Sequence, residues 1–330
     1  MRKVSQKDIA ESLNLSRVTV TKALKDHPDI AVKTIEKVKD KALEMGYIPD
    51  FIGRSLSSSR TYTIGIVIPK IAHSFFSYSI EKIYESAHKI GYNIIPMVSF
   101  EDQAVELENI RTLLSMRVDG IILDIAQNST DNKGYELAMN SGCSIVFYDR
   151  CPAHHTDGSI VTNDREAAYE LTQHLIEKGY RKIYHFAGPS LLNISDERRK
   201  GFEDAMNESN LLCHILNVEM QRKNGYEAFM RMVKNNELPD AIFAINDPVA
   251  HGIYDAAAEL GMKIPGDIAV AGFGDLHTSA LLTPSMTTVK PPLDDMAEAA
   301  VEMLVKMMDN NCSSCKQEVF KAKIIIRDST

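Results

Sequence analysis

Residues near the start of the chain combine basic and hydroxyl-bearing side chains at helical spacing. Arg17, Thr21 and Lys22 fall on one face of a helix with 3.6 residues per turn, and Val18 lies within the same arc. Arginine and lysine donate to guanine O6 and N7 and to phosphates, threonine bonds to either, and valine packs on a thymine methyl group. The pattern predicts a face that reads double-stranded DNA. The alternative is a solvated face of a basic helical bundle that docks on protein.

Short helices must position this face. Apolar residues recur at helical spacing in three consecutive blocks. Ser5 with Asp8 forms a capping pair for the first helix, Ser16 caps the second, and Gly46 with Pro49 ends the third. The second helix then carries the reading face and the first supports it, as in a helix-turn-helix. We therefore predict a small all-α DNA-binding domain over residues 1–49.

Charge is distributed unevenly along the 330 residues. The net charge is −8, yet residues 1–60 hold 12 Lys and Arg against 8 Asp and Glu, or +4, which leaves −12 for the remainder. A basic head on an acidic body indicates that only the head meets a polyanion. The composition, 44% apolar and 25% charged, excludes disordered and collagen-like classes. No apolar run is long enough for a membrane span or a signal core, so we expect a cytoplasmic protein.

The pattern changes after a serine-rich stretch at residues 50–61, which predicts a linker and a domain boundary. Short β-branched runs then alternate with amphipathic segments. The expected strands are Thr63–Pro69, Asn93–Ser99, Gly120–Asp124, Ser144–Tyr148, Ser159–Thr162, Lys182–Phe186, Ala241–Ile245 and Ile268–Gly272. The expected helices are Phe76–Ile90, Ala104–Met116, Arg165–Lys178, Asp196–Ser209, Gly225–Asn235, Pro248–Leu260 and Leu293–Asp309. This alternation predicts two α/β lobes with parallel sheets, divided near residue 160 and separated by a cleft.

Ligands of open α/β sheets bind beyond the carboxyl ends of the strands, so the residues just after each strand are the candidates. Aromatic rings, carboxylates, amides and one arginine in those segments suit a hydroxyl-rich ligand. The candidate effector-binding residues are His73, Phe75, Phe76, Asp149, Asn163, Arg198, Asn246 and Asp275. The alternatives are core packing for the phenylalanines, helix caps for the aspartates and a surface ion pair for Arg198.

Catalytic and metal-binding patterns are weak. The chain has no Gly-x-Ser-x-Gly, phosphate loop or dinucleotide fingerprint, so we predict no catalytic residues, no cofactor and no enzyme activity. Cys312 and Cys315 have redox or half-zinc spacing without two further ligands nearby, and His154 with His155 stand alone in a polar loop. We predict no metal site. The five cysteines are few, odd in number and scattered, so reduced thiols are expected.

Residues 4–24 resemble the N-terminal DNA-binding motif of the lactose-repressor (LacI/GalR) family of bacterial transcription regulators. The likeness spans the chain in the family's order. It continues through Gly46-Tyr47-Ile48-Pro49, Arg54-Ser55-Leu56, Arg60-Thr61, Ile64-Gly65, Arg117-Val118-Asp119-Gly120-Ile121-Ile122, Asn246-Asp247, Thr283-Pro284-Ser285-Met286-Thr287-Thr288-Val289 and Ile326-Arg327-Asp328-Ser329-Thr330.

The resemblance implies a ligand-responsive repressor that binds a pseudo-palindromic operator as a homodimer. Residues 50–61 would form a hinge that enters the minor groove, where Leu56 acts as a wedge. Residues 62–330 would form a body like periplasmic binding proteins, which holds a sugar or related polar metabolite and the dimer contacts. The implied DNA-binding residues are Ser16, Arg17, Val18, Thr21, Lys22, Arg54 and Leu56.

Asp50, Gly53 and Thr21-Lys22 depart from the family's usual residues, and a further departure bears on the ligand. Gly274 stands where the family commonly has an aspartate that holds a ligand hydroxyl, so a standard sugar pose does not carry over. Two other function classes share parts of this reading. A solute-binding receptor has the two-lobed body but needs an export signal and no head. A cytosolic sugar-converting α/β enzyme needs a catalytic acid and base, which the sequence does not supply.

Overall fold

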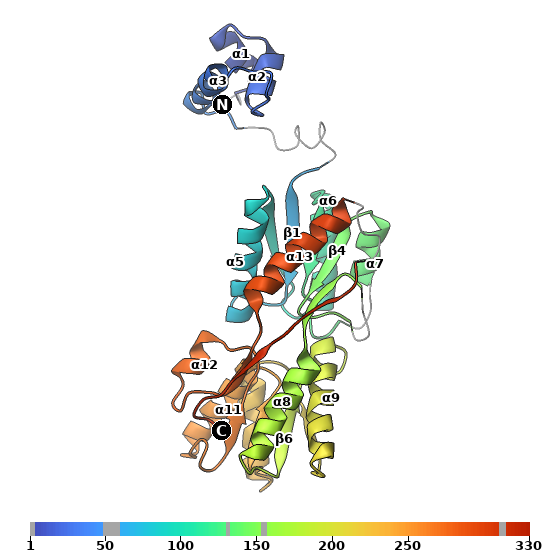
Figure 1. The fold of residues 1–330 in the computed structure, drawn as a ribbon, viewed down its shortest axis with the longest axis vertical. Coiled ribbons are helices and arrows are strands. Elements are labelled where there is room, and N and C mark those ends of the chain that lie inside the picture. Colours follow the sequence, from blue (N-terminus) through green and yellow to red (C-terminus); the bar gives the residue numbers. More distant parts are fainter. Residues whose placement is uncertain (1–3, 49–59, 130–132, 153–156, 310–314) are drawn as a thin grey trace. The chain divides into compact units, whose positions relative to one another are not determined.

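The computed structural model describes residues 4–48, 60–129, 133–152, 157–309 and 315–330 (Figure 1). The chain divides into two units, residues 1–61 and residues 62–330, and each is considered by itself. Within the described ranges, no helix is both long enough and apolar enough to cross a membrane.

The first unit is a bundle of short helices, α1 (Gln6–Leu13), α2 (Arg17–Ala23) and α3 (Val32–Glu44). Ser5 and Asp8 form a capping box, because each side chain accepts a hydrogen bond from the other residue's backbone N–H. The Ser16 side chain caps α2 by accepting from Thr19 N at 3.0 Å. The core holds Ile9, Ala10, Val20, Ala23, Val38 and Ala42. These contacts confirm the predicted all-α head.

The second unit contains two α/β lobes. The first lobe has a parallel sheet in the order β11-β5-β4-β3-β1-β2. Its strands are β1 (Thr63–Ile68), β2 (Asn93–Val98), β3 (Gly120–Leu123), β4 (Ser144–Tyr148), β5 (Ser159–Thr162) and β11 (Glu318–Phe320). Its helices are α5 (Ser74–Lys89), α6 (Gln103–Ser115), α7 (Lys133–Asn140) and α13 (Leu293–Met308).

The second lobe has a parallel sheet in the order β7-β6-β8-β9, and β10 pairs antiparallel with β12. Its strands are β6 (Ile183–Ala187), β7 (His214–Asn217), β8 (Ala241–Ala244), β9 (Ala269–Ala271), β10 (Thr288–Lys290) and β12 (Lys323–Ile325). Its helices are α8 (Asp164–Glu177), α9 (Asn193–Glu208), α10 (Arg222–Lys234), α11 (Asp247–Glu259) and α12 (His277–Leu281).

The chain passes from the first lobe to the second between β5 and α8, close to the predicted division near residue 160, but it later returns to the first lobe, which was not predicted. The C-terminal segment returns to the first lobe, where α13 packs on α5 and on β3 and β4, and β11 pairs with β5 (Figure 1). Packing explains the return, because Met296, Ala300 and Leu304 of α13 are buried in the core of the first lobe. Gly120 permits this approach, since a Cβ atom there would lie 2.8 Å from Leu304 Cδ1.

Cysteine chemistry differs from the expectation at one position. Cys143 and Cys151 are buried free thiols and Cys213 is an exposed one, whereas Cys315 is disulfide-bonded. The expectation of reduced thiols is therefore wrong for Cys315. Of the other residues weighed as metal ligands, His154, His155 and Cys312 lie outside the described residues. Across the described part of the chain, no group of three or more His, Cys, Asp or Glu residues could hold a metal ion.

Candidate functional site

A cavity lies between the two lobes and is lined by residues of both. Six of the eight predicted effector residues line it: His73, Phe75, Phe76, Asp149, Arg198 and Asn246. The remaining walls come from Arg150, Ile194, Met220, Pro248, Phe273, Gly274, Leu276 and Pro291. The cavity thus combines aromatic and apolar surfaces with a few charged and amide groups, as small-molecule sites do.

Arg198 in α9 supplies a fixed cation to the cavity. Its Nε donates to Asp164 Oδ1 at 2.6 Å and its Nη1 donates to the carbonyl oxygen of Ile245 at 2.7 Å. The guanidinium also stacks on the ring of Phe273, with Cζ 3.6 Å from the ring centroid. Among the described residues, no acceptor is bonded to Nη2, so this nitrogen can donate to a ligand. Arg198 is 5% exposed, which rules out the surface ion pair.

Asp149 faces the cavity from the first lobe, directly after β4. Its backbone is in the left-handed region, with φ 59°, and its N–H donates to the carbonyl oxygen of Ile160 at 2.9 Å. Burial raises the pKa of Asp149 to about 6, although the positive charge of Arg198 acts in the opposite direction. The Asp149 side chain thus lines the cavity from the first lobe, and Arg198 lines it from the second.

Three aromatic rings at the start of α5 form one wall. His73 Nδ1 accepts from Phe75 N at 3.3 Å and so caps the helix. The His73 and Phe76 ring centroids lie 5.1 Å apart, and those of Phe75 and Phe76 lie 5.4 Å apart. Burial, with Arg150 nearby, lowers the pKa of His73 to about 4, so the imidazole is neutral at pH 7. With Nδ1 as an acceptor, Nε2 carries the proton and can donate to a ligand.

Asn246 closes the opposite wall at the start of α11. Its Oδ1 caps the helix by accepting from Val249 N at 3.0 Å, and its Nδ2 donates to the carbonyl oxygen of Met220 at 3.2 Å. One N–H of the Asn246 amide remains for a ligand. Gly274 lies beside this wall with φ 134°, and a Cβ atom there would meet nothing closer than 3.8 Å. The positive φ at Gly274 favours glycine at this position.

Two predicted residues do not line the cavity. The Asn163 side chain accepts from Ala322 N at 2.8 Å and donates to Glu166 at 2.6 Å, so it fastens the chain between β11 and β12. Asp275 pairs with Arg327 at 2.6 Å and so fixes the C-terminal segment. Both side chains are held by segments far along the sequence, and the position of a residue after a strand does not predict such partners.

Sequence reasoning missed three polar residues of the site. Arg150 lines the cavity with its Cζ 5.1 Å from the Phe76 ring centroid, and Glu101 pairs with it from behind at 3.1 Å. Asp164, rather than its neighbour Asn163, holds Arg198. Arg150 and Asp164 each follow a predicted strand, so the signal was present. Asp149 and its neighbour Arg150 both line the cavity, whereas of Asn163 and Asp164 only Asp164 bonds to Arg198.

The predicted DNA-reading face lies on α2 in the first unit. Ser16, Arg17 and Val18 are exposed, whereas Thr21 and Lys22 are half-buried. The Thr21 hydroxyl is within hydrogen-bond distance of Gln6 Oε1, at 2.7 Å. Lys22 Nζ pairs with Asp29 at 2.8 Å. The two other predicted DNA-binding residues, Arg54 and Leu56, lie outside the described residues.

Comparison with known proteins identifies the family. The periplasmic binding protein-like domain matches residues 172–330. The NTD biosynthesis operon regulator of Bacillus subtilis (strain 168) is 30% identical over 332 residues, which cover 98% of each chain. The chain belongs to the LacI/GalR family of transcription regulators. Catabolite control protein A of Priestia megaterium is 28% identical, again over 98% of both chains.

The fold of this LacI/GalR chain is shared over its whole length. A crystal structure of the lac repressor dimer bound to operator and the anti-inducer ONPF has a TM-score of 0.89 at 21% identity, and the match covers 100% of this chain and 99% of that one. The family and the fold class that the residues predicted are therefore confirmed: a helical head precedes a periplasmic-binding-protein-like body with parallel sheets.

Proposed function

We propose that this LacI/GalR chain is a ligand-responsive repressor that binds a pseudo-palindromic operator as a homodimer. Its α2 face would read the major groove through Ser16, Arg17, Val18, Thr21 and Lys22. Arg54 and Leu56 would contact the minor groove, with Leu56 as the wedge. The relative that is named an operon regulator, and the lac repressor structure that holds operator DNA, support this assignment.

The effector would bind in the cavity between the lobes. The observation that carries this proposal is the placement of two opposite charges on opposite lobes. The Arg198 guanidinium is fixed by Asp164, Ile245 and Phe273, and Asp149 lines the same cavity from the first lobe. A ligand that bonds to both favours one arrangement of the lobes, and only such differential affinity can shift DNA binding.

The chemistry of the walls points to a small ring compound with several polar groups, such as a sugar or a related polar metabolite. Aromatic rings would pack on the ring face, and the guanidinium, carboxylate and amide groups would bond to its substituents. His73, Phe75, Phe76 and Asn246 complete this set. Asn163 and Asp275 do not belong to it, and Arg150 does.

A repressor acts where its operator DNA lies, so the protein would be cytoplasmic. The cavity would then sense a ligand and would not catalyse a reaction. A sugar-converting enzyme would need an acid and a base aimed at one reacting centre. Asp149 and the neutral His73 are the titratable candidates in the cavity, and conversion of any sugar by the purified protein would favour the enzyme.

A selection of duplexes from a random DNA library, followed by mobility-shift assays, tests the DNA-binding part. A palindromic site of nanomolar affinity is expected, and the absence of any enriched site would overturn the DNA-binding proposal.

A thermal-shift panel of sugars, sugar phosphates, nucleosides and purines tests the effector part. A compound at 100 times its Kd adds about 2.7 kcal/mol to the stability of the unit that binds it. The effector assignment fails if a compound stabilises Arg198→Lys as well as the unaltered protein.

A further inference from the structure

A chain of hydrogen bonds joins the two walls of the cavity through residues that do not line it. Arg150 Nη1 donates to the Glu101 carboxylate at 3.1 and 3.2 Å, and Gln127 N donates to the same carboxylate at 2.8 Å. Gln127 Oε1 accepts from Met220 N at 3.3 Å, and the Met220 carbonyl oxygen accepts from Asn246 Nδ2 at 3.2 Å. Arg150, Met220 and Asn246 line the cavity, whereas Glu101 and Gln127 do not.

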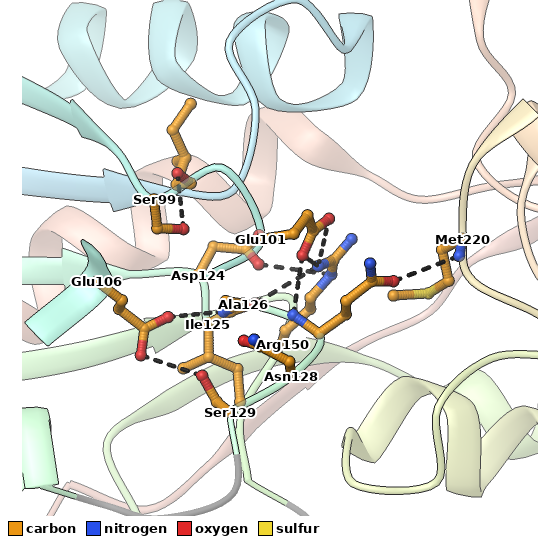
Figure 2. Close-up of polar contacts among 12 residues, drawn as sticks. Ser99, Glu101, Glu106, Asp124, Ile125, Ala126, Asn128, Ser129, Arg150 and Met220 are labelled. Carbon is orange, nitrogen blue, oxygen red and sulfur yellow. Dashed lines mark hydrogen bonds and ion pairs between the residues drawn. The ribbon is translucent and has the colours of Figure 1, made fainter. Parts of the chain in front are cut away.

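This chain crosses from one lobe to the other. Glu101 follows β2 and Gln127 follows β3, both in the first lobe, whereas Met220 lies between β7 and α10 of the second. Figure 2 shows Glu101 and Arg150 together on one side, with a dashed contact reaching Met220 across the junction. Asn193 also bonds across the lobes, because its Nδ2 donates to the carbonyl oxygen of Asp149 at 3.1 Å. Gln127 is thus one of the side chains that connect the lobes.

Arg150 Nη1 makes its shorter hydrogen bonds to Glu101, and it also donates to the carbonyl oxygen of Ile125 at 3.4 Å. Arg150 Nε lies 3.6 Å from Asp124 Oδ1, yet this nitrogen and both Asp124 oxygens are buried without a hydrogen-bond partner. Asp124 is therefore joined to the same guanidinium by a long ion pair without a hydrogen bond. If Arg150 lost Glu101, its charge would draw it toward Asp124 and change the cavity wall.

The backbone around Glu101 is strained. Phe100 and Glu101 are consecutive residues in the left-handed region, with φ 55° and 62°. Each such non-glycine residue costs about 1–2 kcal/mol. Strain of this kind persists where surrounding contacts determine the conformation. Here those contacts are the bonds of the Glu101 carboxylate to Arg150 and to the Gln127 amide.

We propose that Glu101 and Gln127 form a latch between the lobes, and that this latch sets where Arg150 and Met220 stand in the cavity walls. The two latch residues are positioning residues that act on a bound effector through their neighbours. They therefore help to decide which compounds the cavity accepts. The inference rests on the proposed function only in treating the cavity as the effector site.

Hydrogen exchange resolved to single amides tests the latch in the free, full-length protein. Gln127→Leu removes the acceptor of the Met220 amide, whose exchange should rise about three- to tenfold. Because Met220 holds Asn246, which caps Val249, the Val249 amide should also exchange faster. Gln127→Glu keeps an acceptor oxygen but adds a carboxyl near Glu101, so it should restore both amides at a pH where that carboxyl is protonated.

Asn128 provides the matched control. Its Oδ1 also accepts from one backbone amide, Gln103 N at 2.9 Å, but that bond stays inside the first lobe. Asn128→Leu should raise the exchange of Gln103 alone. The latch is overturned if Gln127→Leu affects Met220 and leaves Val249 unchanged, or if Asn128→Leu affects Val249 equally.

Two further measurements separate the latch from folding and from the effector assignment. In the unaltered protein, the Gln127 and Met220 amides belong to different lobes, and the latch requires that low urea exposes them together. Different opening free energies for the two amides would overturn it even if Gln127→Leu fails to fold.

In the thermal-shift panel, Gln127→Leu should change the order in which compounds stabilise the protein, and Asn128→Leu should not. An unchanged order for Gln127→Leu counts against the latch. If no compound stabilises any variant, the effector assignment fails and the exchange data still decide the latch.

Discussion

The guanidinium of Arg198 stacks on the ring of Phe273, with its Cζ atom 3.6 Å from the ring centroid. A planar cation is required for this contact, and its fork also bonds to Asp164 and to the Ile245 carbonyl oxygen. Lysine keeps the charge but loses the plane and the fork.

Arg198→Lys should therefore weaken effector binding by about 10- to 100-fold, the range for lost charge-assisted hydrogen bonds. Operator affinity without effector should change little, because Arg198 belongs to the second unit and the reading face to the first. Titration calorimetry and mobility shifts measure the two effects. Arg165→Lys is the control, since Arg165 pairs with Asp204 on the surface at 2.7 Å. Loss of operator binding in Arg198→Lys would show that this residue maintains the fold instead.

Lys22→Ala should lower operator affinity by about 1–3 kcal/mol and relax the preference at one base position, if Lys22 reads a base edge. Mobility shifts on a set of single-base variants of the operator measure both effects. Uniform weakening on every sequence, with a smaller salt dependence, would instead make Lys22 a phosphate contact.

Asp29→Asn should tighten operator binding, by up to about fivefold at low salt, because Asp29 holds Lys22 Nζ at 2.8 Å in the free head. The gain should disappear as salt screens the pair. Asp26→Asn makes the same change in net charge, but its partner is Lys39 of α3, at 2.6 Å. Equal gains for the two variants would mean that only net charge matters and that the Lys22 pair does not compete with DNA.

Glu106→Gln should flatten the pH dependence of stability. Burial raises the pKa of Glu106 from 4.5 to about 7, although the Ala126 amide and the Ser129 hydroxyl bond to its carboxylate (Figure 2). The native state therefore holds a proton that the unfolded chain releases, so this contribution to stability is present below pH 4.5 and is lost as the pH rises to 7. The loss amounts to roughly 3 kcal/mol.

Urea unfolding at pH 5 and pH 8 measures this effect. The unaltered protein should lose stability relative to Glu106→Gln as the pH rises, because glutamine keeps an acceptor for Ala126 N without a charge. Glu108→Gln on the exposed side of the same helix should follow the unaltered protein. Parallel pH profiles for the unaltered protein and Glu106→Gln would contradict the raised pKa.

Local sequence accounts for much of what the structure shows. The capping box of Ser5 and Asp8 depends on residues three positions apart, and the strands and helices of the body follow β-branched runs and 3.6-residue periodicity. Polar residues that follow a strand can also be recognised from local sequence. Asp149, Arg198 and Asn246, predicted in this way, line one cavity.

Tertiary structure decided what depends on partners far along the chain. Whether Asn163 faces a cavity or binds Ala322, 159 residues away, is set by the return of the C-terminal segment. The same holds for Gln127, which meets Met220 across the lobes although nothing in its neighbourhood marks it. Propensity and periodicity depend on neighbours within a few residues. Which side chains after a strand face the ligand site depends instead on long-range packing and on buried charges that need partners. The sequence by itself therefore determined most of the elements, the family and most of the cavity. Only the folded chain showed the short elements β7, β10, β11, β12, α7 and α12 and the connections that join the cavity walls.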